Sequence, residues 1–131
     1  MIIRETAAGD FNHKAGVQQQ ISNYTLVGAI APTRYANNAI GYSWTDGSPV
    51  VSATNSTTGL FVTGAGGGFS LTLPADTSVR TLKVYVGAWR TQGRLVAHLS
   101  DGSAVDYVDT SLSNSAGVTT LGVYTLNYRA S

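Results

Sequence analysis

Short runs of alternating apolar and polar residues are the dominant pattern along this chain. In the clearest run, residues 69–73, Phe69, Leu71 and Leu73 fall on one face while Ser70 and Thr72 fall on the other. A period of two is that of a half-buried β-strand. Similar runs, bounded by Gly, Asn, Asp and Pro, predict strands near residues 17–22, 24–30, 40–45, 49–54, 59–64, 69–73, 80–89, 94–99, 104–109 and 119–129.

Helical periodicity is nearly absent, and its best window, residues 14–21, is short and polar. About ten strands are more than one flat, open sheet of this length accommodates, so the strands should pack as two sheets. We therefore predict an all-β fold, a two-sheet antiparallel sandwich of jelly-roll type, formed by a single domain over residues 1–131.

The longest alternating stretch lies between Arg80 and Ser100. One face carries Leu82, Val84, Val86 and Ala88, and the other carries Lys83, Tyr85, Gly87 and Trp89. The strand expected after residues 90–93 alternates in the same phase. This agreement predicts a hairpin with a four-residue loop, whose cross-strand pairs would be Trp89–Arg94, Ala88–Leu95, Val86–Ala97 and Tyr85–His98.

Such a hairpin would gather Tyr85, Trp89, Arg94 and His98 on its outer face. Two interpretations stay open. Another segment or a neighbouring chain covers this face as ordinary core or interface, or the face binds a carbohydrate. Sugar rings stack their C–H faces on Trp and Tyr, while Arg and His donate hydrogen bonds to sugar hydroxyls. We expect the other tryptophan, Trp44, to lie in the core before an Asp-Gly turn.

Composition narrows the class of partner. Charged residues make up 11% of the chain and the net charge is +1, against about 25% charged residues in typical domains. No basic stripe is present, so we expect no nucleic-acid binding. The uncharged polar residues Thr, Ser, Asn, Gln and Gly that dominate the remainder are common on extracellular β-proteins. Without cysteine the chain forms no disulfide.

The first residues, Met1 to Glu5, contain no apolar run long enough for a signal peptide or a membrane span. We expect no membrane insertion. We interpret the chain as a module of a secreted or cell-surface protein, excised from a longer chain and without its leader.

Catalytic constellations are not indicated. His98, Ser100 and Asp101 are adjacent, but side chains at these spacings do not converge on one nucleophile, and no G-x-S-x-G motif surrounds the serine. Most carboxylates fall in turn contexts, which does not indicate the facing pair of a glycosidase. We therefore expect a protein that is not an enzyme and has no catalytic residues.

Three carboxylates, Asp101, Asp106 and Asp109, fall within nine residues. Clustered oxygen ligands suit calcium, but the spacing is not that of an EF-hand loop. We expect an ordinary Asp-Gly turn leading into a strand, with a structural calcium ion as the weaker alternative and no other cofactor.

Several phrases resemble a β-sandwich module, similar to galactose-binding jelly rolls, of multidomain secreted bacterial proteins. The phrases are His13-Lys14-Ala15-Gly16-Val17, Gln19-Gln20-Ile21-Ser22-Asn23-Tyr24-Thr25, Tyr42-Ser43-Trp44-Thr45-Asp46-Gly47-Ser48-Pro49, Leu73-Pro74-Ala75-Asp76-Thr77, Arg80-Thr81-Leu82-Lys83-Val84-Tyr85-Val86-Gly87 and Leu99-Ser100-Asp101-Gly102-Ser103. The resemblance implies a β-sandwich beside other extracellular modules and brings no catalytic residues. Relatives of this kind begin with a Trp- and His-rich segment, where this chain has Met1 to Asp10, and continue past the final Tyr-Arg-Ala with a further strand, where this chain stops at Ser131. The resemblance thus implies either an open sheet edge, which invites pairing with another chain, or replacement of the missing strand by Ile2-Ile3.

Two functions follow as expectations. The first is a non-catalytic module that binds a polysaccharide or other glycan through Tyr85, Trp89, Arg94 and His98. The second is a structural or adhesive module that self-associates, as a homodimer, through an exposed sheet edge.

Overall fold

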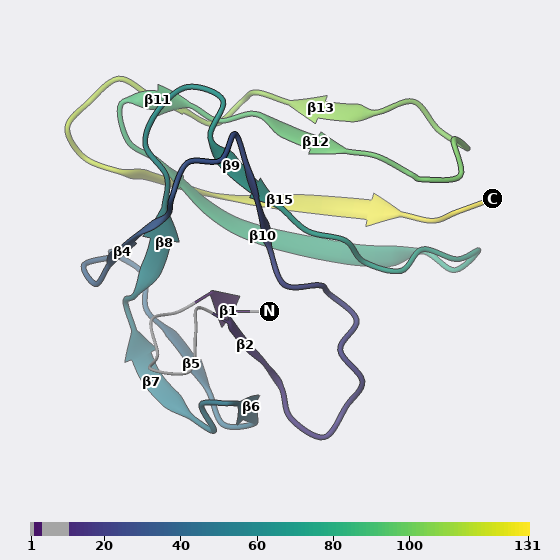
Figure 1. Cartoon of the computed structure of the whole chain (residues 1–131), viewed down its shortest axis with the longest axis horizontal. Helices are drawn as coiled ribbons and strands as arrows, with labels where there is room; N and C mark the ends of the chain where they lie inside the picture. Colours follow the sequence, from purple (N-terminus) through teal and green to yellow (C-terminus); the bar gives the residue numbers. More distant parts are fainter. Residues whose placement is uncertain (1, 4–10) are drawn as a thin grey trace. The chain divides into compact units, whose positions relative to one another are not determined.

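The computed structural model describes residues 2–3 and 11–131, and every regular element in these residues is a β-strand (Figure 1). The strands are β1 (Ile2–Ile3), β2 (Phe11–Lys14), β3 (Thr25–Val27), β4 (Thr33–Tyr35), β5 (Tyr42–Trp44), β6 (Gly47–Ser48), β7 (Ala53–Ser56), β8 (Gly59–Phe61), β9 (Gly68–Ser70), β10 (Arg80–Ala88), β11 (Thr91–Gln92), β12 (Leu95–Ala97), β13 (Tyr107–Asp109), β14 (Ser113–Asn114) and β15 (Thr120–Tyr128). All strand pairs are antiparallel. The all-β prediction is confirmed.

The chain divides into two units, Met1–Pro74 and Ala75–Ser131. Within the described residues each unit contains small antiparallel sheets of two or three strands, and none of these sheets closes on itself. The finer prediction of two packed jelly-roll sheets is therefore not established by the strand pairing.

The first unit is built on one long, irregular hairpin. Its pairs step inward along the chain from Thr25–Ser70 through Thr33–Phe61 to Tyr42–Ser56 and Trp44–Ala53. Consequently β3, β4 and β5 run antiparallel to β9, β8 and β7 in turn. The register shifts between Tyr42 and Trp44, where the ladder has a bulge or other irregularity. A separate three-stranded sheet has the order β1-β2-β6.

Aromatic side chains pack between segments of the first unit. The ring of Tyr24 lies 4.8 Å from that of Phe11 and 5.1 Å from that of Phe69, measured between centroids. Phe69, Leu71 and Leu73 are partly buried, whereas Ser70 and Thr72 are exposed. The alternation predicted for residues 69–73 is therefore confirmed in its burial pattern.

Trp44 has a structural role, as expected. Its Nε1–H donates to the backbone carbonyl of Val50 at 2.9 Å, while the amide of Val50 donates to Oδ1 of Asn12 at 2.9 Å. Asn12 is only 2% exposed. The peptide groups of Val50 are thus held from both sides, and Gly47 lies so close that a Cβ there would come within 2.6 Å of the indole nitrogen.

The predicted strand at residues 17–22 is wrong. Strand β2 lies earlier, at Phe11–Lys14, and Gly16 has a left-handed φ of 71° that turns the chain after it. Val17 is 56% exposed and is followed by three glutamines. This segment has no apolar alternation to bury. Strand β4 at Thr33–Tyr35 was not predicted, because Pro32 and the polar residues around it indicate a loop.

The second unit is a second long hairpin, and β10 pairs with β15 along its full nine residues, from Arg80–Tyr128 to Ala88–Thr120. We call this two-stranded pair the β10–β15 ribbon. Beyond it, the pairing continues through Thr91–Asn114 to Leu95–Asp109 and Ala97–Tyr107. The chain reverses only after residue 98, where Gly102 N–H donates to the carbonyl of Leu99 at 3.0 Å.

The prediction of a hairpin that turns at residues 90–93 is therefore wrong. β10 pairs with β15, and β12 pairs with β13. Arg90 has a left-handed φ of 50°, so the chain bends at this point instead of reversing. The alternating burial of β10 and β12 agrees with the prediction. Alternation defines the two faces of a strand but does not identify the strand it pairs with.

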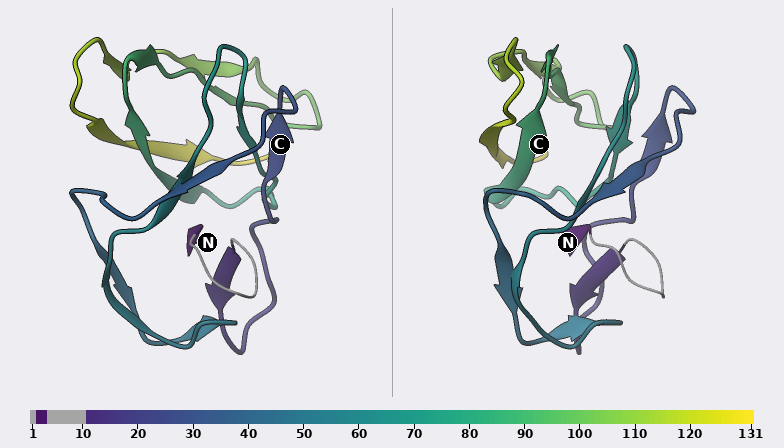
Figure 2. Two further views of the ribbon diagram at one scale, coloured as in Figure 1. Left: turned by 60° about the vertical axis from the view of Figure 1, so that its left-hand side comes forward. Right: turned by 90° about the vertical axis from the view of Figure 1, so that its left-hand side faces the viewer.

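Within the second unit, the segment after the bend lies over one face of the β10–β15 ribbon (Figure 1 and Figure 2). The covered face carries the apolar row Leu82, Val84, Val86, Ala88, Tyr124, Leu126 and Tyr128. Contacts across the layers include Leu112, which approaches Gly122 so closely that a Cβ there would lie 3.3 Å from its Cδ1. Ala88 is 1% exposed and is the one fully buried apolar residue among those the structure describes.

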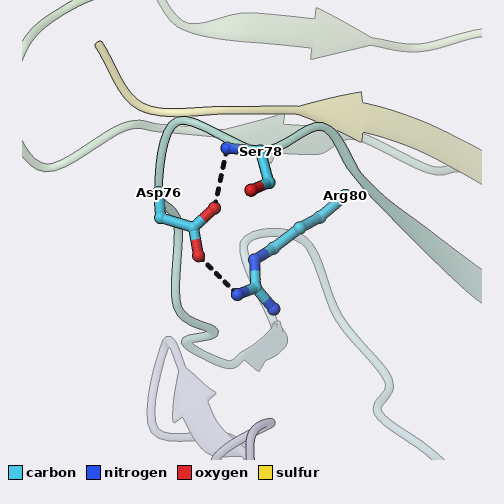
Figure 3. Close-up of polar contacts among 3 residues, drawn as sticks. All are labelled: Asp76, Ser78 and Arg80. Carbon is cyan, nitrogen blue, oxygen red and sulfur yellow. Dashed lines mark hydrogen bonds and ion pairs between the residues drawn. The ribbon is translucent and has the colours of Figure 1, made fainter.

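The loop before β10 is fastened by Asp76 (Figure 3). One carboxylate oxygen accepts the Ser78 N–H at 2.8 Å, and the other accepts from the Arg80 guanidinium at 2.5 Å. The backbone carbonyl of Asp76 also accepts from Ala130 N–H at 2.8 Å. The bond from the Ser78 N–H to the carboxylate two residues earlier makes this loop an Asx turn.

Candidate functional site

The outer face of the β10–β15 ribbon presents Tyr85. This side chain is 57% exposed and lies opposite Val123, which is 50% exposed. The neighbouring pairs on the same face are Lys83–Thr125 and Thr81–Asn127, and the Thr81 hydroxyl lies 2.7 Å from the Asn127 amide oxygen. Tyr85 therefore stands in a row of polar groups that are suited to hydrogen bonding with hydroxyls.

Trp89 follows directly after β10 at the bend. It is 55% exposed, yet its Nε1–H donates to the carbonyl of Gly117 at 3.1 Å. The guanidinium of Arg90 lies 5.1 Å from the centre of the ring, in cation–π geometry. These two contacts hold the exposed indole in one orientation.

Arg94 and His98 flank β12, the strand that pairs with β13: Arg94 directly precedes it and His98 directly follows it. Because β10 pairs with β15, neither residue lies opposite β10 as the predicted hairpin required. Both residues are exposed. His98 Nδ1 lies 2.7 Å from Oδ1 of Asp106, which places it in the turn between β12 and β13. The structure thus retains two exposed aromatics from the predicted four-residue face and places the basic residues elsewhere.

A depression of about 250 Å³ lies along β15 and was not predicted from the sequence. Tyr107, Asp109 and Ser111 line it from one side, and the β15 residues Val123, Tyr124 and Thr125 line it from the other. Tyr107 is 51% exposed. Of the three β15 residues, Tyr124 belongs to the covered face, whereas Val123 and Thr125 belong to the outer face, where Val123 is the cross-strand neighbour of Tyr85.

Asp109 is held in place within this depression. Its Oδ1 accepts the Ser111 N–H at 2.7 Å, and its Oδ2 accepts the Tyr107 hydroxyl at 3.1 Å. Hydrogen bonds from the side chain and backbone of Ser111 keep the pKa of Asp109 below its usual range. The bond to Asp109 and its negative charge raise the pKa of Tyr107. At neutral pH the site therefore pairs an ionised acceptor with a neutral phenol.

Tyr124 brings a second phenol to the depression. Its buried hydroxyl has no hydrogen-bond partner among the residues that the structure describes, and burial, followed by the charge of Asp109, raises its pKa. An unsatisfied buried hydroxyl costs about 1–3 kcal/mol. A water molecule or a ligand hydroxyl that reached this oxygen would recover part of that cost.

The sequence did contain a signal for Asp109. The pattern Asp-x-Ser occurs four times, at Asp46-Gly47-Ser48, Asp76-Thr77-Ser78, Asp101-Gly102-Ser103 and Asp109-Thr110-Ser111. In the last three, the carboxylate accepts the serine N–H two residues later, at 2.7–2.9 Å, whereas Asp46 pairs with Lys14. The pattern therefore indicates candidate Asx turns, and the third one that forms is at Asp109. Only tertiary structure shows that the third turn faces an aromatic-lined depression.

The three carboxylates considered for calcium have separate partners. Asp101 accepts from Ser103, Asp106 pairs with His98, and Asp109 accepts from Ser111 and Tyr107. Among residues 2–3 and 11–131, no three His, Asp or Glu side chains come together as a metal site would require. Nor does this part of the chain contain a helix with the length and hydrophobicity of a transmembrane span.

No protein-family model, curated protein or solved structure matches this chain. The resemblance to galactose-binding jelly rolls therefore stays a prediction.

Proposed function

We propose that this protein is a non-catalytic carbohydrate-binding module, and that a glycan stacks on Tyr85 and Trp89. The observation that supports this function best is the presence of two aromatic side chains, each more than half exposed, at the middle and the end of one strand. Exposing such rings forgoes their burial energy, and an apolar sugar face offers them a partner.

The surroundings of the two rings supply hydrogen-bonding groups and a restricted indole. Tyr85 is flanked by Lys83, Thr125 and Val123 on the outer face of the ribbon. The bond to Gly117 restricts the Trp89 indole, so less conformational entropy is lost when a sugar ring docks. In this proposal Arg94 and His98 contribute only through a ligand long enough to reach β12.

The same proposal includes the location of the protein and the packing of its sheets. We infer a secreted or cell-surface module with a two-sheet jelly-roll architecture, no bound nucleic acid and no membrane insertion. Sparse charge and a surface of uncharged polar residues support the setting. The two successive long antiparallel hairpins support the architecture, since jelly rolls are built from antiparallel connections of this kind.

Affinity electrophoresis in gels containing soluble polysaccharides, followed by titration with the retarding glycan, tests this function. We expect Tyr85→Ala and Trp89→Ala each to weaken binding by about tenfold, equivalent to about 1.4 kcal/mol. Val105→Ala is the control, because Val105 is 95% exposed in the connection between β12 and β13, away from both rings in the chain. Unchanged thermal unfolding would show that each variant is folded. The proposal fails if no glycan binds, or if both aromatic variants bind as tightly as the unmodified protein.

A second candidate function is a structural or adhesive module that self-associates. It is favoured by the nine-residue strands β10 and β15, each of which has one edge without a paired strand among the residues described. Unpaired strand edges are templates for pairing with a second copy.

A further inference from the structure

We propose that the depression along β15 is a polar subsite that binds the hydroxyl groups of a neutral sugar residue, with the Asp109 carboxylate as acceptor. This inference rests on the proposed carbohydrate-binding function and deepens it, because it assigns a position and a chemical class to the hydroxyl-recognising part of the ligand.

The acceptor capacity of Asp109 supports the subsite. A carboxylate has about four acceptor positions. Hydrogen bonds from Ser111 and from the Tyr107 hydroxyl occupy up to three of them. At least one position remains for a ligand O–H. The two neighbours orient the carboxylate before the ligand arrives, and a bond from a hydroxyl to an ionised acceptor is stronger than one between neutral groups.

The remaining lining completes a site for a polyhydroxylated ring. The half-exposed ring of Tyr107 supplies an aromatic surface. Tyr124 supplies the buried hydroxyl that has no partner among the described residues. A volume of about 250 Å³ lies slightly below the range typical of drug-sized ligands, which suits one monosaccharide residue.

The charge of the site predicts its selectivity. Asp109, the carboxylate among the lining side chains, has no lysine or arginine beside it in the lining. A ligand carboxylate or sulfate would therefore meet an ionised aspartate, and like charges at this distance repel. The subsite should bind neutral sugar residues and reject uronic acids, sialic acids and sulfated sugars.

Val123 belongs to the lining of the depression and is also the cross-strand neighbour of Tyr85 on the outer face. A glycan that passes around β15 at this residue would place one sugar residue in the depression and the next beside Tyr85. The two sites would act on one ligand, with Tyr85 stacking on a ring and Asp109 recognising hydroxyls.

Titration of Asp109→Asn with the glycan that retards the unmodified protein tests the subsite. The substitution preserves shape and removes the charge, and we expect affinity to fall by about tenfold. It should also reduce the preference for neutral over uronate-containing polysaccharides. Tyr107→Phe is a second variant. It removes one orienting hydroxyl from an exposed position where folding is not at risk, and we expect a smaller loss.

Asp101→Asn is the matched control. Asp101 is in the same Asp-x-Ser motif and the same unit, and it accepts the Ser103 N–H at 2.9 Å, but it lies outside the depression. Equal losses in Asp101→Asn and Asp109→Asn would overturn the subsite, as would full affinity in both Asp109→Asn and Tyr107→Phe. In those cases the unmodified protein still binds glycan and the general function stands. Absence of any glycan binding by the unmodified protein would overturn both proposals.

Discussion

At the residue scale, close backbone approaches and fixed side-chain partners matter more than large buried side chains. Gly28 lies against the backbone of the 64–68 loop, and a Cβ added there would come within 2.5 Å of the Gly66 carbonyl oxygen. Asn12 and Trp44 hold the Val50 peptide groups by hydrogen bonds. These contacts define the first unit although the described residues include no large side chain that is fully buried.

Gly28 and Gly16 form a pair of substitution sites that differ in one respect. Both have left-handed φ angles, 75° and 71°, but a Cβ at Gly16 would meet nothing within 4 Å. We expect Gly16→Ala to reduce the free energy of unfolding by about 1–2 kcal/mol, the cost of the backbone conformation. Gly28→Ala should cost about 1–3 kcal/mol more, because the Gly66 carbonyl must move. Urea denaturation of both variants measures the difference in unfolding free energy. Equal losses would show that Gly28 is not in contact with the loop that contains Gly66.

At the element scale, short Asx turns determine where strands begin and end. The Asp76 turn introduces β10 and fastens its first residue, Arg80 (Figure 3). The Asp101 turn lies in the connection between β12 and β13, and the Asp109 turn ends β13. Carboxylates that accept several hydrogen bonds are stabilised in the ionised form. The turns therefore make the strand ends sensitive to acid.

Asp76 makes this sensitivity measurable. The Arg80 side chain, followed by the Ser78 backbone, lowers the pKa of Asp76 in the folded protein. Its contribution to stability is complete above the unfolded-state pKa of about 3.9 and is lost as the pH falls through the lower, folded-state pKa. We expect the unmodified protein to be more stable than Asp76→Asn at pH 7, and the two unfolding free energies to converge as the pH approaches 2. A difference that stays constant over this range would mean that the charge of Asp76 is not involved.

At the scale of the whole molecule, two successive long hairpins are the organising feature, one in each unit. In the second unit the nine-residue β10–β15 ribbon is covered on one face and exposed on the other, with both outer edges unpaired by any described strand. The exposed face supports glycan binding, while the unpaired edges support self-association. Oligomeric state separates these two functions.

Sedimentation velocity over a wide range of protein concentrations tests self-association through β15. The carbohydrate-binding proposal expects a monomer at all concentrations. The adhesive alternative expects a dimer that Val123→Lys disrupts, because a charge beside an edge strand opposes pairing. Val105→Lys is the control, since it adds the same charge at a residue that is 95% exposed in the connection between β12 and β13. A dimer that persists in Val123→Lys and dissociates in Val105→Lys would exclude the β15 edge.

The sequence by itself determined the faces of the strands that alternate most clearly. The alternation of residues 69–73 and 80–88 occurs in the structure as predicted. A period of two depends only on the order of side chains within one strand, which is a local property.

Only the tertiary structure decided which strands are neighbours. Alternation at residues 80–99 is equally compatible with a turn at 90–93 and with a bend there, and the structure has the bend, because β10 pairs with β15 far along the chain. That choice separated Arg94 and His98 from Tyr85 and brought Asp109 to Tyr124. Strand pairing depends on contacts between residues distant in sequence, and a period of two identifies a face without identifying its partner.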